Sequence, residues 1–85
     1  MNIQFLNHAL LRMAERNISR LLVEQAVERL DKVERSVKDI RRLLFKKKYT
    51  HDSAGERLLI VVAEKSGNTV VVVTIIDTSR IQRYL

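Results

Sequence analysis

The sequence predicts an α+β fold in which two N-terminal helices are followed by a mostly antiparallel four-stranded sheet. Three observations support this prediction. The first 30 residues carry apolar side chains at helical spacing between capping residues, and two later segments are rich in β-branched residues. The third observation is that Ile40–Tyr49, read as a strand, would give the sheet a basic face that carries Arg42, Lys46 and Lys48. With no Pro and only two Gly, nothing in the composition suggests a linker, so we expect one domain spanning residues 1–85.

Capping residues mark where the two expected helices begin and end. The first helix is expected over Leu6–Arg16, with Asn7 as its N-cap and Asn17 in the left-handed position that follows a helix end. The second is expected to begin after the N-cap residue Ser19 and to run over Arg20 to about Leu30. Both helices would place one apolar face on the core.

The end of the second helix is less clearly signalled than its beginning. No Pro or Gly stops it, and apolar residues continue at spacings of three and four as far as Leu44. By periodicity alone, residues 31–48 would therefore continue the helix and could form a coiled coil. The alternative is that these residues form strands.

The C-terminal half favours strands for these residues. Leu58–Glu64 and Thr69–Asp77 read as a hairpin closed by the turn Lys65–Asn68, and both strands are apolar on both faces. In the second strand, Val70 and Val72 would face away from Val71, Val73 and Ile75. A hairpin that is apolar on two faces needs further strands beside it and cover on both faces. The segments that can supply those strands are Val33–Val37 and Arg41–Tyr49, with His51–Glu56 as a loop.

Charge is the strongest functional signal in the chain. The net charge is +6, and five basic residues with no acidic residue lie between Arg41 and Lys48. Clustered cations are typical of proteins that bind a polyanion, because each neutralised phosphate releases counterions. Acidic proteins and anionic membranes would be attracted in the same way.

Several classes of site and location are disfavoured. The chain has no Cys, its two His residues are far apart, and its two Gly residues stand alone, so we expect no metal site, no cofactor and no phosphate-binding glycine loop. The start of the chain is interrupted by charged residues and no apolar run approaches the roughly 20 residues that span a bilayer. We therefore expect a soluble, cytoplasmic protein without a membrane partner.

Three groups of residues are candidates for binding RNA phosphates or moving protons. His8, Arg12 and Arg16 recur every four residues and would form one ridge on the first helix. The second group is a row of cations on one strand face, namely Arg42, Lys46 and Lys48. The third lies in a closing turn over residues 78–85 and consists of Arg80, Arg83 and Tyr84. Each group also has a structural alternative. On the first helix, His8 could be a histidine at the helix edge, and the two arginines could form ion pairs with the second helix. The lysines of the strand could deter edge pairing, and the tail could cap the sheet.

The order of these residues resembles a known family. His8, Arg12, Met13, Arg16, Ile18 and Ser19 are similar to the opening of an uncharacterised prokaryotic family assigned to the RelE/ParE toxin superfamily. The resemblance continues through Asp31–Glu34, the basic and aromatic strand, the Val-rich hairpin and the tail Thr78–Tyr84. It implies an α-α-β-β-β-β fold of microbial RNase type.

The resemblance also implies a function. Superfamily toxins cleave messenger RNA, commonly on the ribosome, and are held by an antitoxin protein. We therefore expect a toxin-like, RNA-binding protein or a metal-independent endoribonuclease, in which His8, Arg83 and Tyr84 are the catalytic candidates. The alternatives are a non-catalytic module that binds nucleic acid or ribosomes, and an interaction protein that forms a homodimer.

Overall fold

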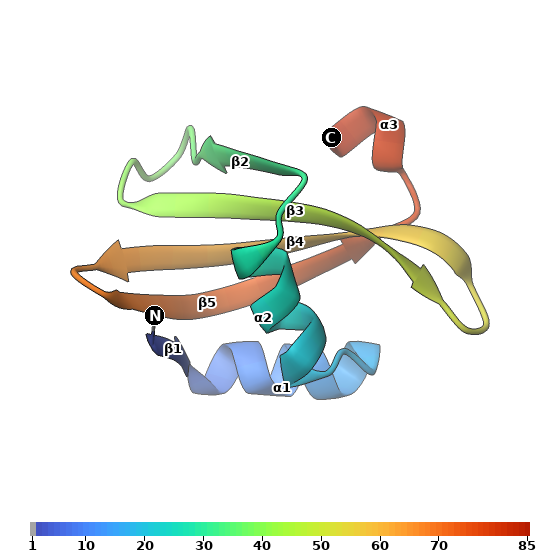
Figure 1. The fold of residues 1–85 in the computed structure, drawn as a ribbon, viewed down its shortest axis with the longest axis horizontal. Coiled ribbons are helices and arrows are strands. Elements are labelled where there is room, and N and C mark those ends of the chain that lie inside the picture. Colours follow the sequence, from blue (N-terminus) through green and yellow to red (C-terminus); the bar gives the residue numbers. More distant parts are fainter. Residues whose placement is uncertain (1) are drawn as a thin grey trace.

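A computed structural model describes residues 2–85 (Figure 1). The elements in chain order are β1 (Asn2–Phe5), α1 (Asn7–Arg16), α2 (Arg20–Glu28), β2 (Lys32–Arg35), β3 (Arg42–His51), β4 (Gly55–Ser66), β5 (Thr69–Thr78) and α3 (Ile81–Tyr84). Within residues 2–85, the strands form one five-stranded sheet in the order β1-β5-β4-β3-β2. All neighbouring strands are antiparallel except β1 and β5, which are parallel.

This architecture corrects the predicted one. The prediction of two helices followed by a mostly antiparallel four-stranded sheet is wrong, because the described residues form three helices and a five-stranded mixed sheet. The additional strand, β1, precedes both long helices. Its residues Ile3 and Phe5 lie opposite Val70 and Val72 and pack on the core. β1 covers an edge of β5 that would otherwise be open to pairing with other chains.

The ends of α1 follow the sequence in part. Leu6, not Asn7, is the N-cap residue, since its backbone is extended and its carbonyl accepts from the Leu10 N–H at 3.1 Å. The prediction for Asn17 is confirmed: its φ is 56°, in the left-handed region. The N–H of Ile18 then donates to the Met13 carbonyl at 2.9 Å, which folds the buried Ile18 side chain back onto the helix end.

The second helix begins as predicted and ends early. The Ser19 hydroxyl oxygen accepts from the Leu22 N–H at 3.1 Å, which confirms the N-cap. α2 stops at Glu28, and no helix runs on to Leu44. Instead β2 pairs with β3, so that Phe45 becomes buried in the sheet. Pairing with β2 also covers the edge of β3. This tertiary context outweighs the local preference for helix that the periodicity of the segment indicates.

The sheet separates two apolar clusters. α1 and α2 pack on one face, which we call the helix face, where they contact Phe45, Leu59 and Val61 among other buried residues. On the opposite face, which we call the α3 face, Ile81 and Leu85 pack against a smaller cluster, consisting of Leu44, Leu58, Ile60 and Val62. The two long helices and the C-terminal turn therefore cover opposite faces of the sheet.

A β-bulge reverses the faces of β5 partway along the strand. The register between β4 and β5 shifts between Val62 and Ala63, which leaves Val73 without a partner on β4. Ile75 therefore points into the helix-face core and is fully buried, whereas the sequence had placed it with Val73 on the other face. Asp77, two residues further on, is turned to the helix face by the same shift.

Candidate nucleic-acid interface

The predicted cation row on β3 consists of three residues in different surroundings. Arg42, Lys46 and Lys48 all belong to the α3 face, since they alternate with residues of the helix face. The Arg42 Nε lies 3.4 Å from Oε2 of Glu64 on β4, whereas the Lys48 side chain is exposed. Lys46 is only 6% exposed. Of the three, Lys48 is the one whose charge is most available to a ligand.

Lys46 fixes the C-terminal turn to the sheet. Its Nζ lies 3.2 Å from Oε1 of Glu34 on β2 and donates a hydrogen bond to the backbone carbonyl of Tyr84. Lys32 acts beside it, with its Nζ 2.9 Å from the same Glu34 oxygen and 2.7 Å from the Leu85 backbone oxygen. Hydrogen bonds from Lys32 and then from Lys46 lower the pKa of Glu34 below its usual range. Two lysines thus join α3 to β2 and β3 through one carboxylate.

Because α3 is held in this way, its exposed basic and aromatic residues belong to the same face of the sheet as Lys48. Ile81 and Leu85 point to the sheet, which leaves the remaining side chains of the turn exposed to solvent. The Arg83 guanidinium lies 5.6 Å from the centre of the Tyr84 ring, and Tyr84 is 41% exposed. We call this group the β3–α3 surface, and it comprises Lys48, Arg80, Arg83 and Tyr84.

The predicted ridge on α1 does not join this surface. α1 packs on the helix face through the buried residues Ala9 and Met13, so His8, Arg12 and Arg16 lie on the other side of the sheet from α3. The α1 ridge, the cation row on β3 and the tail are the three groups of candidate residues that the sequence identifies. The structure brings together β3 and the tail and leaves α1 apart, because the sheet lies between them. His8 and Tyr84, the two candidate proton carriers, are separated for the same reason.

A polar group that the sequence analysis missed lies at the far end of the helix face. The Tyr49 hydroxyl donates to Oδ1 of Asp77 at 2.6 Å, and the Arg57 Nε lies 3.0 Å from the same oxygen. The Asp77 side chain is 8% exposed. Burial, followed by the hydrogen bond to Asp77, raises the pKa of Tyr49 to about 12. The signal for this group in the sequence is a charged residue at the end of each of two apolar strands, Arg57 and Asp77. The signal is insufficient, because without the bulge Asp77 would point away from Tyr49.

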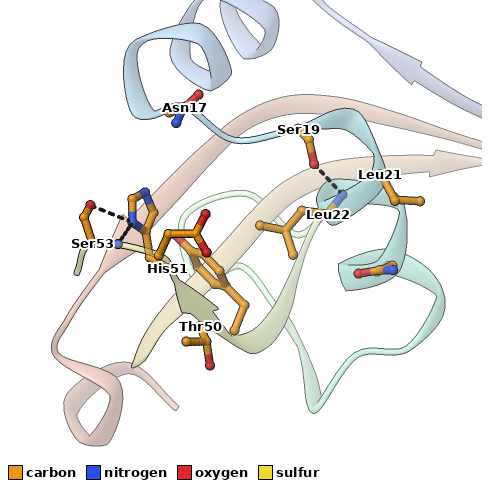
Figure 2. Close-up of a pocket in the computed structure, with 10 residues that line it drawn as sticks. Asn17, Ser19, Leu21, Leu22, Thr50, His51 and Ser53 are labelled. Carbon is orange, nitrogen blue, oxygen red and sulfur yellow. Dashed lines mark hydrogen bonds between the residues drawn. The ribbon is translucent and has the colours of Figure 1, made fainter. Parts of the chain in front are cut away.

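Beside this group, a hollow opens between the start of α2 and the turn that joins β3 to β4 (Figure 2). Its volume is about 460 Å³, and its lining includes Asn17, Leu22, Tyr49, His51 and Asp52. The His51 Nδ1 accepts a hydrogen bond from the Ser53 N–H at 3.2 Å. The sequence predicts a loop at His51, but this residue is the last one of β3, and it lines the hollow.

Among residues 2–85, no three His, Asp or Glu side chains gather closely enough to hold a metal ion. Within the same part of the chain, no helix has the length and apolar character needed to cross a bilayer.

Comparison with known proteins gives one match. Residues 5–77 match the family model described as "Domain of unknown function (DUF4258)". The matched segment contains both long helices and nearly all of β2 to β5, and it ends before α3. Neither the curated proteins nor the solved structures contain a significant match to the chain.

Proposed function

We propose that this chain, which belongs to the DUF4258 family of domains of unknown function, binds single-stranded RNA at the β3–α3 surface. The observation that carries the proposal is the attachment of α3 to β3 by Lys46. This attachment sets Arg80 and Arg83 on the same face as Lys48. Since none of these three cations has a carboxylate within 4.0 Å among the described residues, their charges are available to phosphates.

Two further observations favour RNA over other polyanions. Tyr84 presents an exposed aromatic ring beside Arg83, and such a pair can stack on an unpaired base. The second is the resemblance of the sequence to the RelE/ParE toxin superfamily, in which RNA is the substrate. We propose membership of that superfamily as the finer assignment, with a cytoplasmic location and with an antitoxin protein as partner.

Cleavage of the bound RNA is the more specific form of this proposal. Attack of a 2′-hydroxyl on its phosphate requires a proton acceptor, a proton donor and cations near the developing charge. Tyr84 and Arg83 are the catalytic candidates on the β3–α3 surface, whereas His8 lies across the sheet. Ribosomes would present the RNA, as they do for superfamily toxins.

The binding experiment compares two Arg→Ala variants that lose the same charge on opposite faces. Fluorescence anisotropy with a labelled single-stranded RNA would be measured over a range of salt concentrations. We expect Arg83→Ala to weaken binding and to reduce the slope of log K against log [salt] by about 0.7 for one lost phosphate contact. Arg16→Ala on α1 is the matched control, and its effect should be smaller. Equal effects of the two variants, or no binding by the unaltered protein, would contradict the proposal.

The cleavage experiment uses the same proteins. RNA would be incubated with and without ribosomes, and growth would be followed on expression of the chain, alone and together with the adjacent open reading frame. Loss of cleavage in Tyr84→Phe with unchanged RNA affinity would support a catalytic role. Intact RNA in every reaction, together with unaffected growth, would contradict cleavage and would be consistent with a module that binds RNA without cutting it.

A further inference from the structure

The hollow between α2 and the β3–β4 turn has the properties of a small-ligand site. Its volume of about 460 Å³ falls within the range of roughly 300–1,000 Å³ that is usual for ligand pockets. It lies on the helix face, since Leu22 and Tyr49 pack against the helix-face core. The β3–α3 surface is on the other face, so the hollow is a separate site that does not depend on the proposed function.

The walls of the hollow are held in place before any ligand arrives. The Tyr49 hydroxyl is fixed by Asp77, and the first turn of α2, which carries Leu22, is fixed by the Ser19 cap. On the opposite wall, His51 is held by the N–H of Ser53 (Figure 2). A preformed site loses less conformational entropy on binding than a mobile one.

The polar groups of the hollow form a pattern of donors and acceptors. A neutral imidazole whose Nδ1 accepts a hydrogen bond carries its proton on Nε2, so His51 offers an Nε2–H donor. Figure 2 shows this second ring nitrogen turned away from Ser53. Asp52 contributes a carboxylate whose two oxygens can each accept a hydrogen bond from a ligand, and Asn17 and Gln25 contribute amides. Leu22 and the Tyr49 ring supply apolar surface for a flat ligand.

We propose that this hollow binds the nucleobase guanine. Guanine presents two neighbouring donors, N1–H and the N2 amino group, which match the two oxygens of the Asp52 carboxylate. Its O6 and N7 atoms are acceptors that match the His51 Nε2–H and an amide N–H. Adenine has an acceptor at N1, where it would meet the carboxylate unfavourably. The ring faces would lie on Leu22 and Tyr49.

The lining argues for the base and against the phosphate as the bound group. Among the described side chains that line the hollow, none is Lys or Arg, and Asp52 would repel an anion. The guanine can come from a free nucleotide or from an unpaired position in RNA, and both present the same base edge.

The test is a titration of the ¹⁵N-labelled full chain with GMP, AMP and inorganic phosphate, followed by NMR. We expect GMP to shift the amide signals of Leu22, His51 and Ser53 and to bind at least tenfold more tightly than AMP or phosphate. Equal binding of the three ligands, GMP shifts confined to other residues, or no binding of GMP would each overturn the proposal.

A pair of charge-removing variants tests the role of the carboxylate. Asp52→Asn should weaken GMP binding at least tenfold without weakening AMP binding, because the new amide places a donor against a guanine donor. Glu15→Gln, on the exposed face of α1, removes the same charge outside the hollow and should leave GMP binding unchanged. Identical behaviour of the two variants would contradict guanine recognition by Asp52.

Two oligonucleotides distinguish the sources of the base. An RNA tetranucleotide with one G would be compared with the same RNA carrying A and with free GMP. Tighter binding of the G-containing RNA than of both GMP and the A-containing RNA would identify RNA as the source. Binding of the G-containing RNA no tighter than that of GMP would identify the free nucleotide. Equal binding of the two RNAs by a chain that also fails to prefer GMP would overturn the proposal.

Discussion

The Tyr49 hydroxyl donates a hydrogen bond of 2.6 Å to Oδ1 of Asp77, across 28 positions of sequence. Arg57 contacts both oxygens of the same carboxylate, at 3.0 and 3.1 Å. The acceptor is nearly buried, so each donor that it loses leaves it poorly solvated. This group joins three strands at the end of the sheet where the hollow opens.

Removing the Tyr49 hydroxyl should destabilise the fold. We expect Tyr49→Phe to lower the free energy of unfolding by about 1–2 kcal/mol, because a hydrogen bond to a nearly buried carboxylate is lost. Urea denaturation measures the change. Tyr84→Phe removes the same atom from an exposed ring and should change the free energy by less than about 0.5 kcal/mol. A similar loss in both variants would contradict a structural role for the Tyr49–Asp77 bond.

The same bond predicts how stability depends on alkaline pH. The pKa of Tyr49 is raised from 10.0 to about 12, first by burial and then by the hydrogen bond to Asp77, so folding favours the protonated hydroxyl. This contribution is fully present below pH 10 and is lost as the pH rises from 10 to about 12. Unfolding measured at several pH values should show a smaller loss over this window in Tyr49→Phe than in the unaltered chain. An identical loss in the two proteins would mean that the Tyr49 titration is not coupled to folding.

The attachment of α3 by Lys46 can be tested by hydrogen exchange. Lys46→Met keeps most of the aliphatic stem but loses the hydrogen bond to the Tyr84 carbonyl and the ion pair with Glu34. We expect faster amide exchange at Leu85, whose N–H bonds to the Ile81 carbonyl in α3. Total stability should change less, because replacing a buried lysine by an apolar residue offsets part of the loss.

Lys47→Met is the matched control for this measurement. Lys47 is the next residue on β3 but belongs to the helix face, where its Nζ donates to the Arg29 carbonyl. Its replacement should leave the exchange of α3 unchanged. If both variants loosen α3 equally, Lys46 does not specifically hold it.

Glu34 should titrate below its ordinary value of 4.5, because hydrogen bonds from Lys32 and Lys46 stabilise its charged form. The stability that this carboxylate contributes is fully present above pH 4.5 and is lost as the pH falls through the pKa of Glu34 in the folded state. Carboxyl ¹³C NMR would follow the titration directly. Lys32→Met removes the largest cause and should move the midpoint upward, and an unchanged midpoint would show that the Lys32 contact is absent in solution.

The local features of the fold were readable from single residues. Asn17 occupies the left-handed position, Ser19 caps α2, and the alternation of Arg42, Lys46 and Lys48 places them on one strand face. Each of these depends on backbone geometry over a few neighbouring positions, so short-range rules suffice.

Features that depend on distant partners were not readable in this way. The four residues of β1 alternate polar and apolar, but a segment this short does not identify a strand by itself. They form a strand because β5 has an open edge with which they pair. The bulge at Val73 has no signature within Thr69–Ile76, a run in which every residue is β-branched, yet it decides where Ile75 and Asp77 point.

By itself, then, the sequence determined the chemistry that this protein carries: an excess of cations, the residues that end α1 and begin α2, and strands apolar enough to require cover on both faces. Only the tertiary structure decided which of these groups act together. It places Lys48 and Arg83 on the same face of the sheet, Tyr49 beside Asp77 and His51 beside Asn17, and it separates His8 from Tyr84. The physical reason is that a sheet has two faces, and one unpaired residue in a strand exchanges the faces of all the residues after it.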